Sequence, residues 1–182
     1  MRKSVLIAAA TFALLSACRE QVGDNEVVSN GPAAAQAPES PPAPPPPATK
    51  EEALKLMHDR HEGMEQIGKS TKAIGAQLKE AEPNFGLIRT NAATINELAA
   101  KSENWFPTGT GPDVGKTRAK AEIWQKYDDF AAKDRDFRQA AQAFTGSANS
   151  ADVNSIKPAF EALGKTCKAC HDSYRTEKKG HD

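Results

Sequence analysis

The chain has 182 residues, of which 24 are basic and 24 are acidic, so its formal net charge is zero. This balance argues against a broad basic surface that holds nucleic acid, and we expect no nucleic-acid partner. Three cysteines are too few for a disulfide-rich scaffold, and no apolar run reaches the roughly 18 residues needed to span a bilayer. Composition therefore favours one ordinary domain with additional segments.

Residues 1–17 have the composition of an export signal. Arg2 and Lys3 precede an almost wholly apolar run, which is the pattern of a secretory signal peptide. The run ends Leu-Ser-Ala-Cys at Cys18, which resembles the lipobox of bacterial lipoproteins. The resemblance implies cleavage before Cys18 and lipidation of its thiol, with plain secretion and an unmodified Cys18 as the alternative. It predicts a periplasmic protein held to the membrane only by lipid, and Arg19 favours the outer membrane.

Residues 18–48 contain the cysteine and a tether rich in proline and alanine. Few large apolar groups are present, so the segment is predicted to be disordered because it cannot bury enough surface to offset its ordering entropy. The run from Pro41 to Pro47 predicts an extended polyproline II spacer of about 20 Å. Its expected role is to hold a domain away from the membrane, and a proline-motif docking site is the weaker alternative.

Residues 49–182 have the periodicity of four amphipathic helices. The first begins at a capping box, Thr49 to Glu52, and the second begins near Pro83. The third spans roughly 116–145, and the fourth begins near Ser155 unless Pro158 kinks it. Apolar residues recur at spacings of three, four and seven, in the first helix at Leu54, Met57, Met64, Ile67, Ile74 and Leu78. The pattern predicts an all-α, antiparallel up-down-up-down four-helix bundle.

A short motif in the fourth predicted helix carries chemistry. Cys167-Lys168-Ala169-Cys170-His171 has the pattern C-x-x-C-H, which attaches haem c through both thiols and offers the histidine to the iron. A structural zinc site needs a second ligand pair, and a thioredoxin-like pair belongs to a strand–helix setting. A disulfide within one helix is strained. The motif therefore predicts one covalent haem, with Cys167 and Cys170 as attachment points and His171 on the iron.

The motif and its surroundings resemble the cytochrome c′ family. The similar segments are CKACHDSYR at residues 167–175, FPTGTG at 106–111 and TRAKAEIW at 117–124, together with Arg60 and Met64. Cytochrome c′ is a standard example of the up-down-up-down bundle, so the resemblance and the helix pattern imply the same fold. The resemblance covers residues 50–180 and implies one haem c near the C-terminus.

The resemblance also implies roles around the haem. Met64 is expected over the distal face, and Phe106 is expected in the pocket lining. Arg60 and His61 are expected near the haem edge, with Arg60 pairing with a propionate. Arg175 is expected either near the proximal face or as a solvated cation at the helix end. The family's iron is typically high-spin, so the chain is expected to bind nitric oxide or carbon monoxide and not to be an enzyme.

Met64 leaves a second function open. A thioether can ligate haem iron, and ligation by His171 and Met64 suits a low-spin electron carrier with a redox partner protein. A methionine can instead simply fill space over the iron. Gly63 and the two middle segments favour the high-spin gas-binding type, and the low-spin carrier is the alternative. The resemblance further implies a homodimer through the first two helices, which an exposed apolar stripe there would favour.

Overall fold

The structure is a computed structural model that describes residues 42–177. Our predictions for the signal peptide, for Cys18 and for most of the tether lie outside the described residues. Within the described range the regular elements are all helices, accompanied by one isolated β-bridge, so the all-α prediction is confirmed. None of these helices is both long and apolar enough to cross a membrane.

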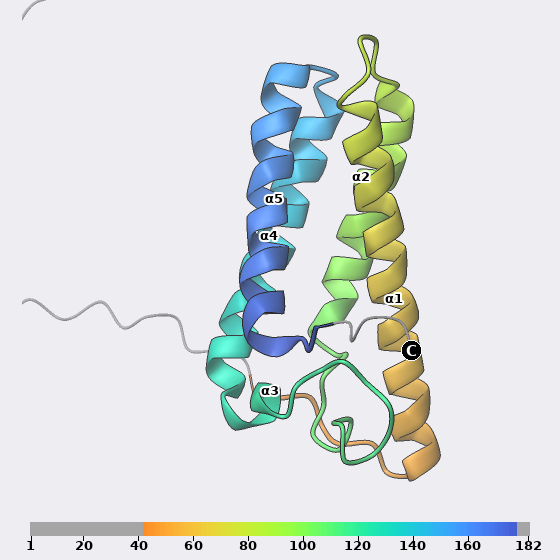
Figure 1. The fold of residues 1–182 in the computed structure, drawn as a ribbon, viewed down its shortest axis with the longest axis vertical. Helices are drawn as coiled ribbons and strands as arrows, with labels where there is room; N and C mark the ends of the chain where they lie inside the picture. Colours follow the sequence, from red (N-terminus) through yellow and green to blue (C-terminus); the bar gives the residue numbers. More distant parts are fainter. Residues whose placement is uncertain (1–41, 178–182) are drawn as a thin grey trace, which may run out of the picture. The chain divides into compact units, whose positions relative to one another are not determined.

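Four long helices form the bundle, and they are α1 (Lys50–Gln77), α2 (Phe85–Ser102), α4 (Tyr127–Asn149) and α5 (Val153–Tyr174), with the short α3 (Glu122–Gln125) before α4. α1 packs against α2, α2 against α4, and α4 against α5. Figure 1 shows the resulting pairs, α1 with α2 and α4 with α5. Across residues 42–177, α1 and α5 make no comparable contact. Packing between neighbouring helices is therefore loosest between α1 and α5, where the Phe160 ring lies 3.7 Å from where a Cβ on Gly75 would be.

Side-chain caps set the starts of three helices. The predicted capping box is present, since the Glu52 backbone N–H donates to Thr49 Oγ1 at 3.1 Å and the Thr49 N–H donates to the Glu52 carboxylate at 3.3 Å. Asn84 caps α2, which therefore begins just after the expected Pro83. Asp152 caps α5 through the Asn154 N–H, so this helix begins before Ser155 and Pro158 lies inside it.

The third predicted helix, at 116–145, is wrong at both ends. Residues 116–121 are not helical because Ala119 pairs with Arg175 in the isolated bridge. Lys126, with φ −128° and ψ 48°, then separates α3 from α4. At its other end α4 continues through Gly146 to Asn149, past the predicted end at residue 145.

The buried line of α1 differs from the predicted stripe near its N-terminus. Leu54 is 43% exposed, because this turn directs Ala53 and Met57 inward instead. The buried line then continues through Arg60 and Gly63. Along α2 the sequence predicts a stripe that begins at Phe85 and continues through Ile88, Ala92, Ile95 and Ala99. The last four are fully buried, whereas Phe85 is half-buried. The bundle core is thus aliphatic along α2, whereas a cation lies on the inner face of α1.

Gly63 allows the Trp105 ring to lie directly against α1. A Cβ at this position would be 2.5 Å from Trp105 Cη2, whereas one at Gly68 in the same helix would meet nothing within 4 Å. We expect Gly63→Ala to lower the free energy of unfolding by about 1–3 kcal/mol through overpacking. The control Gly68→Ala should raise it by about 0.5–1 kcal/mol through helix propensity. Urea denaturation followed by circular dichroism measures both, and equal effects at the two sites would contradict the close contact.

Candidate haem-binding site

The last two turns of α5 place both cysteines against the bundle interior. Cys167 and Cys170 are three residues apart, so they share one face of the helix. Both are half-buried free thiols that pack against the core. Burial raises the pKa of Cys167, and it raises the pKa of Cys170 to about 11. Both thiols are therefore protonated at neutral pH, unlike the low-pKa thiols of redox-active pairs.

His171 follows on the same turn and is half-buried. Burial, and then the positive charges of Arg175 and Arg118, lower the pKa of its imidazole to about 4. The ring is therefore uncharged at neutral pH, which is the protonation state that binds a metal.

Hydrogen bonds join residues 174–176, at the end of α5, to residues 118–120, before α3. The Thr176 N–H donates to the Arg118 carbonyl at 2.9 Å, and the Lys120 N–H donates to the Tyr174 carbonyl at 3.0 Å. The Arg118 guanidinium donates twice to the Thr176 carbonyl, at 3.1 and 2.6 Å. These bonds satisfy groups that a helix end leaves unpaired. Arg175 forms the bridge and its side chain is exposed, yet its charge still acts on His171.

Arg60 is buried and organises the loop after α2. Its two terminal nitrogens donate to the carbonyls of Trp105 and Thr110, at 3.2 and 3.1 Å. They also donate to the hydroxyls of Thr110 and Thr117, at 3.3 and 3.1 Å. The guanidinium lies 4.8 Å from the centre of the Phe106 ring, a distance at which a cation is attracted to the ring face. The sequence predicts a haem-edge residue here, and the structure adds this role in holding the loop.

The positive charge of Arg60 has no carboxylate partner within residues 42–177. Burial alone lowers its pKa, to about 10, and the group remains charged at neutral pH. Its four acceptors are neutral, and a buried cation without an anion is costly. The Nε–H also makes no hydrogen bond to any described residue. Arg60 therefore has both the charge and a donor unused by residues 42–177, which together suit a carboxylate group.

Aromatic rings connect the loop with α4 and α5. Phe106 is buried and meets Phe130 edge-on, with ring centres 4.6 Å apart. Phe130 in turn meets Tyr174 at 5.4 Å, and the Tyr174 hydroxyl donates to Asp129 at 2.5 Å. Trp124 Nε1 donates to the carbonyl of Phe106. The predicted pocket residue Phe106 thus belongs to a cluster that reaches the end of α5.

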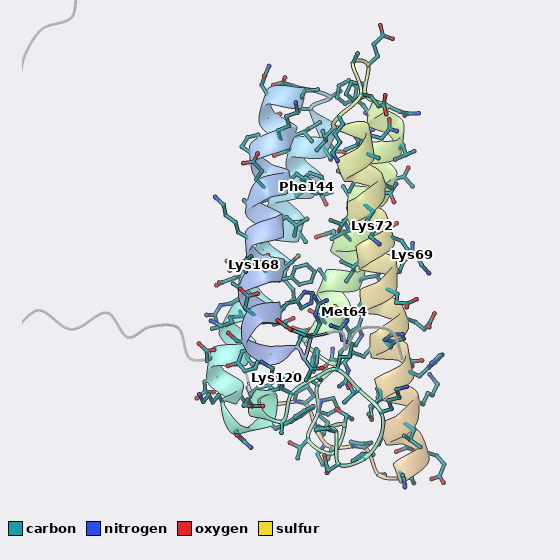
Figure 2. All side chains as sticks on the ribbon, viewed as in Figure 1. Met64, Lys69, Lys72, Lys120, Phe144 and Lys168 are labelled. Atoms are coloured by element: carbon teal, nitrogen blue, oxygen red, sulfur yellow. The ribbon has the colours of Figure 1, made fainter. Side chains whose placement is uncertain are left out.

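Met64 and His61 lie differently on α1. Met64 is half-buried against the core, and Figure 2 shows it at a height between Lys168 on α5 and Lys120 in the loop. The side chain of His61 is 64% exposed, and its Nε2 lies 3.4 Å from Glu65. The structure therefore brings Met64 to the core that also contacts the two cysteines, and it leaves His61 on the surface.

Together these features fit a large planar group that carries carboxylates. The two thiols and the neutral imidazole lie on α5, Met64 lies on α1, and these two helices pack less closely than the other neighbouring pairs. Arg60 offers a buried cation beside Phe106 that has no carboxylate partner among residues 42–177. The donor set is that of haem c, in which two thioethers and a histidine hold the macrocycle.

Sequence reasoning missed a buried polar network beside the site. Asp134 is 7% exposed and lies 2.5 Å from Ser102 Oγ and 3.1 Å from Arg138 Nε. Burial raises the pKa of this carboxyl, against the opposing effects of Ser102 and Arg138. The sequence contains a signal for this burial. Asp134 lies four residues after Phe130 and three before Phe137, so it shares the helix face of two apolar residues and is expected to point inward with them.

Comparison with known proteins agrees with this class of site. The family model described as Cytochrome C′ matches residues 55–175. A protein named cytochrome c′ from Pararhodospirillum photometricum is 33% identical over 116 residues, which cover 64% of this chain and 92% of the relative. The fold and the C-x-x-C-H motif define a four-helix-bundle protein of the c-type haem class. The chain belongs to the cytochrome c′ family, which binds haem c.

Solved structures show the same fold. Cytochrome c′ from Shewanella frigidimarina is 34% identical, with a TM-score of 0.65 over 70% of this chain and 98% of its own. A nitric oxide complex of a mutant cytochrome c′ from Alcaligenes xylosoxidans is 27% identical, with a TM-score of 0.58 over 73% of this chain and 100% of its own. A cytochrome c′ with a ligand-controlled dimer dissociation is also 27% identical, with a TM-score of 0.64 over 72% and 100%.

Removing the Arg60 guanidinium should destabilise the loop. We expect Arg60→Met to lower the free energy of unfolding by about 1–3 kcal/mol, because buried acceptors lose their donor. Arg60→Lys should recover little, since an ammonium cannot reproduce the planar fork. Urea denaturation measures the change, and Arg89→Met on the exposed surface of α2 is the control. An Arg60→Met protein as stable as the control would show that the loop does not depend on this cation.

Proposed function

We propose that the chain is a haem c protein that binds small uncharged gases such as nitric oxide and carbon monoxide. The observation that most supports this proposal is on α5, where two half-buried protonated thiols lie beside an imidazole that is neutral at physiological pH. In this proposal Cys167 and Cys170 form the thioether bonds and His171 binds a high-spin iron. The bound haem supplies an iron to which a diatomic gas can add reversibly. We assign no enzymatic reaction to the site.

The chain's own residues set the conditions around the iron. Met64 would occupy space beside the bound haem and would thereby exclude large ligands. The contact of Trp105 with Gly63 fixes the neighbouring turn of α1, while Arg60 and Phe106 receive the haem edge. His61 is on the surface and offers no acid–base group to a bound gas. The nitric oxide complex of the Alcaligenes xylosoxidans relative supports this proposal, because it shows a gas bound in a protein of the same fold.

A low-spin electron carrier is the second candidate. The observation that favours it is that the Met64 thioether is half-buried and packs against the same core as the cysteines. A thioether and an imidazole on opposite faces of the haem suit electron transfer to a partner protein. The two candidates therefore differ in whether Met64 occupies the sixth position on the iron.

Two substitutions at Met64 separate the candidates. Met64→Leu keeps the side-chain volume but removes the sulfur, so a five-coordinate iron should keep its ferrous optical spectrum. Met64→Ala removes most of the distal obstruction and should raise the carbon monoxide association rate about tenfold, which corresponds to about 1.4 kcal/mol in the barrier. Stopped-flow absorption measures the rate. A change from a low-spin to a high-spin spectrum in Met64→Leu would instead establish the electron carrier.

We further propose a homodimer through α1 and α2. The relative with a ligand-controlled dimer dissociation shows that a protein of this fold can dimerise. The exposed apolar stripe that would favour it is not found, since Leu54 is the one large hydrophobic residue among those described that is exposed. An interface on these helices would therefore rest on polar and small side chains.

The location is also a proposal, namely export to the periplasm and attachment to the outer membrane by lipid on Cys18. It rests on the basic and apolar pattern of residues 1–17 and on the lipobox-like tetrapeptide. We expect the mature protein to begin at Cys18 with a diacylglyceryl thioether and an acylated amine. Mass spectrometry of the N-terminal peptide measures this, and Cys18→Ser is the control without lipid. A mature chain with a free Cys18 thiol would contradict the anchor.

A further inference from the structure

The end of the proline-rich tether lies on the bundle. Pro42 and Pro44 line a cavity of about 230 Å³ together with Tyr127, Phe130 and Ala131 of α4. Pro44 is half-buried, as is Pro47, whose Cδ lies 3.9 Å from where a Cβ on Gly109 would be. The sequence predicts a spacer that ends where the domain begins, whereas residues 42–47 contact the domain itself.

The C-terminal end of this segment is fixed to α1. The Ala48 N–H donates to the Glu52 carboxylate at 2.8 Å, and the Thr49 N–H donates to the same oxygen at 3.3 Å. The capping box therefore sets the direction in which the prolines leave the helix. Because each proline already has a restricted φ, little backbone entropy is lost when the segment lies against a surface.

The surface beneath the prolines has the chemistry of a polyproline groove. Tyr127 and Phe130 provide an aromatic floor, and proline-rich segments dock in aromatic-lined grooves. Ala131, the next residue after Phe130, also lines the cavity and is small enough for a proline ring to lie close. The rim is polar, with Glu103 and Arg138 joined by a 2.7 Å ion pair. A proline-rich segment suits this surface because its rings are apolar and because it has few polar groups that lose water on docking.

We propose that residues 42–47 are a strap that docks on this α4 groove as an intramolecular polyproline ligand and shields the aromatic edge of the haem site from water. Phe130, in the floor, contacts both Phe106 and Tyr174, so the strap covers the cluster that reaches the end of α5. The shielding rests on the proposed function, whereas the docking does not. The family match begins at residue 55, so the strap lies outside the matched region.

The two tyrosines of the chain allow a direct test in the full-length holoprotein. Tyr127 lines the strap cavity, whereas Tyr174 is 4% exposed in the core. In the test variant residues 42–47 are replaced by alternating Gly and Ser, and in the control residues 33–38 are replaced in the same way. Each protein is treated with tetranitromethane, and nitration is measured peptide by peptide. We expect nitration of Tyr127 to rise several-fold in the strap variant alone, with Tyr174 unchanged.

Nitration of Tyr127 that is equal in the strap variant, the control and the unmodified protein would overturn the docking. If nitration of Tyr174 rises as well, the six-residue replacement has disturbed the fold. The single variant Pro44→Gly is then used instead: a rise in Tyr127 nitration supports the docking, and unchanged Tyr127 nitration overturns it.

Shielding is tested by the haem midpoint potential, which should fall in the strap variant because water favours the more charged ferric state. An unchanged potential would overturn the shielding. If the purified chain contains no haem, the proposed function is contradicted, whereas the nitration result still tests the docking of the strap.

Discussion

One buried charge, the guanidinium of Arg60, organises the loops on the side of the bundle where α1 and α5 pack less closely than the other neighbouring helices. Its donors reach loop oxygens as far as the hydroxyl of Thr117, which in turn accepts from the Ala119 N–H at 3.1 Å. Ala119 then pairs with Arg175 immediately after α5. A continuous set of polar contacts therefore connects α1 with the end of α5, although the helices themselves pack less closely than the other neighbouring pairs.

This arrangement explains why the fold and a bound haem are expected to support each other. α5, which packs only loosely with α1, carries half-buried thiols and an uncharged imidazole, which are groups of a cofactor site more than of a closed core. The cation of Arg60 lacks an anion among the described residues, and a propionate would supply one. A ligand that binds only the folded chain also stabilises it by mass action. The protein and its haem are thus expected to form one stable unit.

The elements that could be predicted from the sequence have local signals. The capping box of Thr49 and Glu52, the stripe along α2 and the C-x-x-C-H motif each occupy a few neighbouring residues. The role of Arg60 in the loop could not be predicted, since its partners lie 45 to 57 residues away. The predicted start of the third helix was wrong for a similar reason, because the pairing of Ala119 depends on the distant Arg175. The assigned roles of Met64, His61 and Phe106 at a haem stay predictions.

We propose that this bundle would hold a covalent haem, with His171 as the protein group on the iron and with room for a gas to bind. The most direct measurement is the optical spectrum of the purified ferrous protein before and after addition of carbon monoxide. We predict a high-spin ferrous spectrum that converts to that of a carbon monoxide complex. A low-spin ferrous spectrum that carbon monoxide leaves unchanged would contradict the claim.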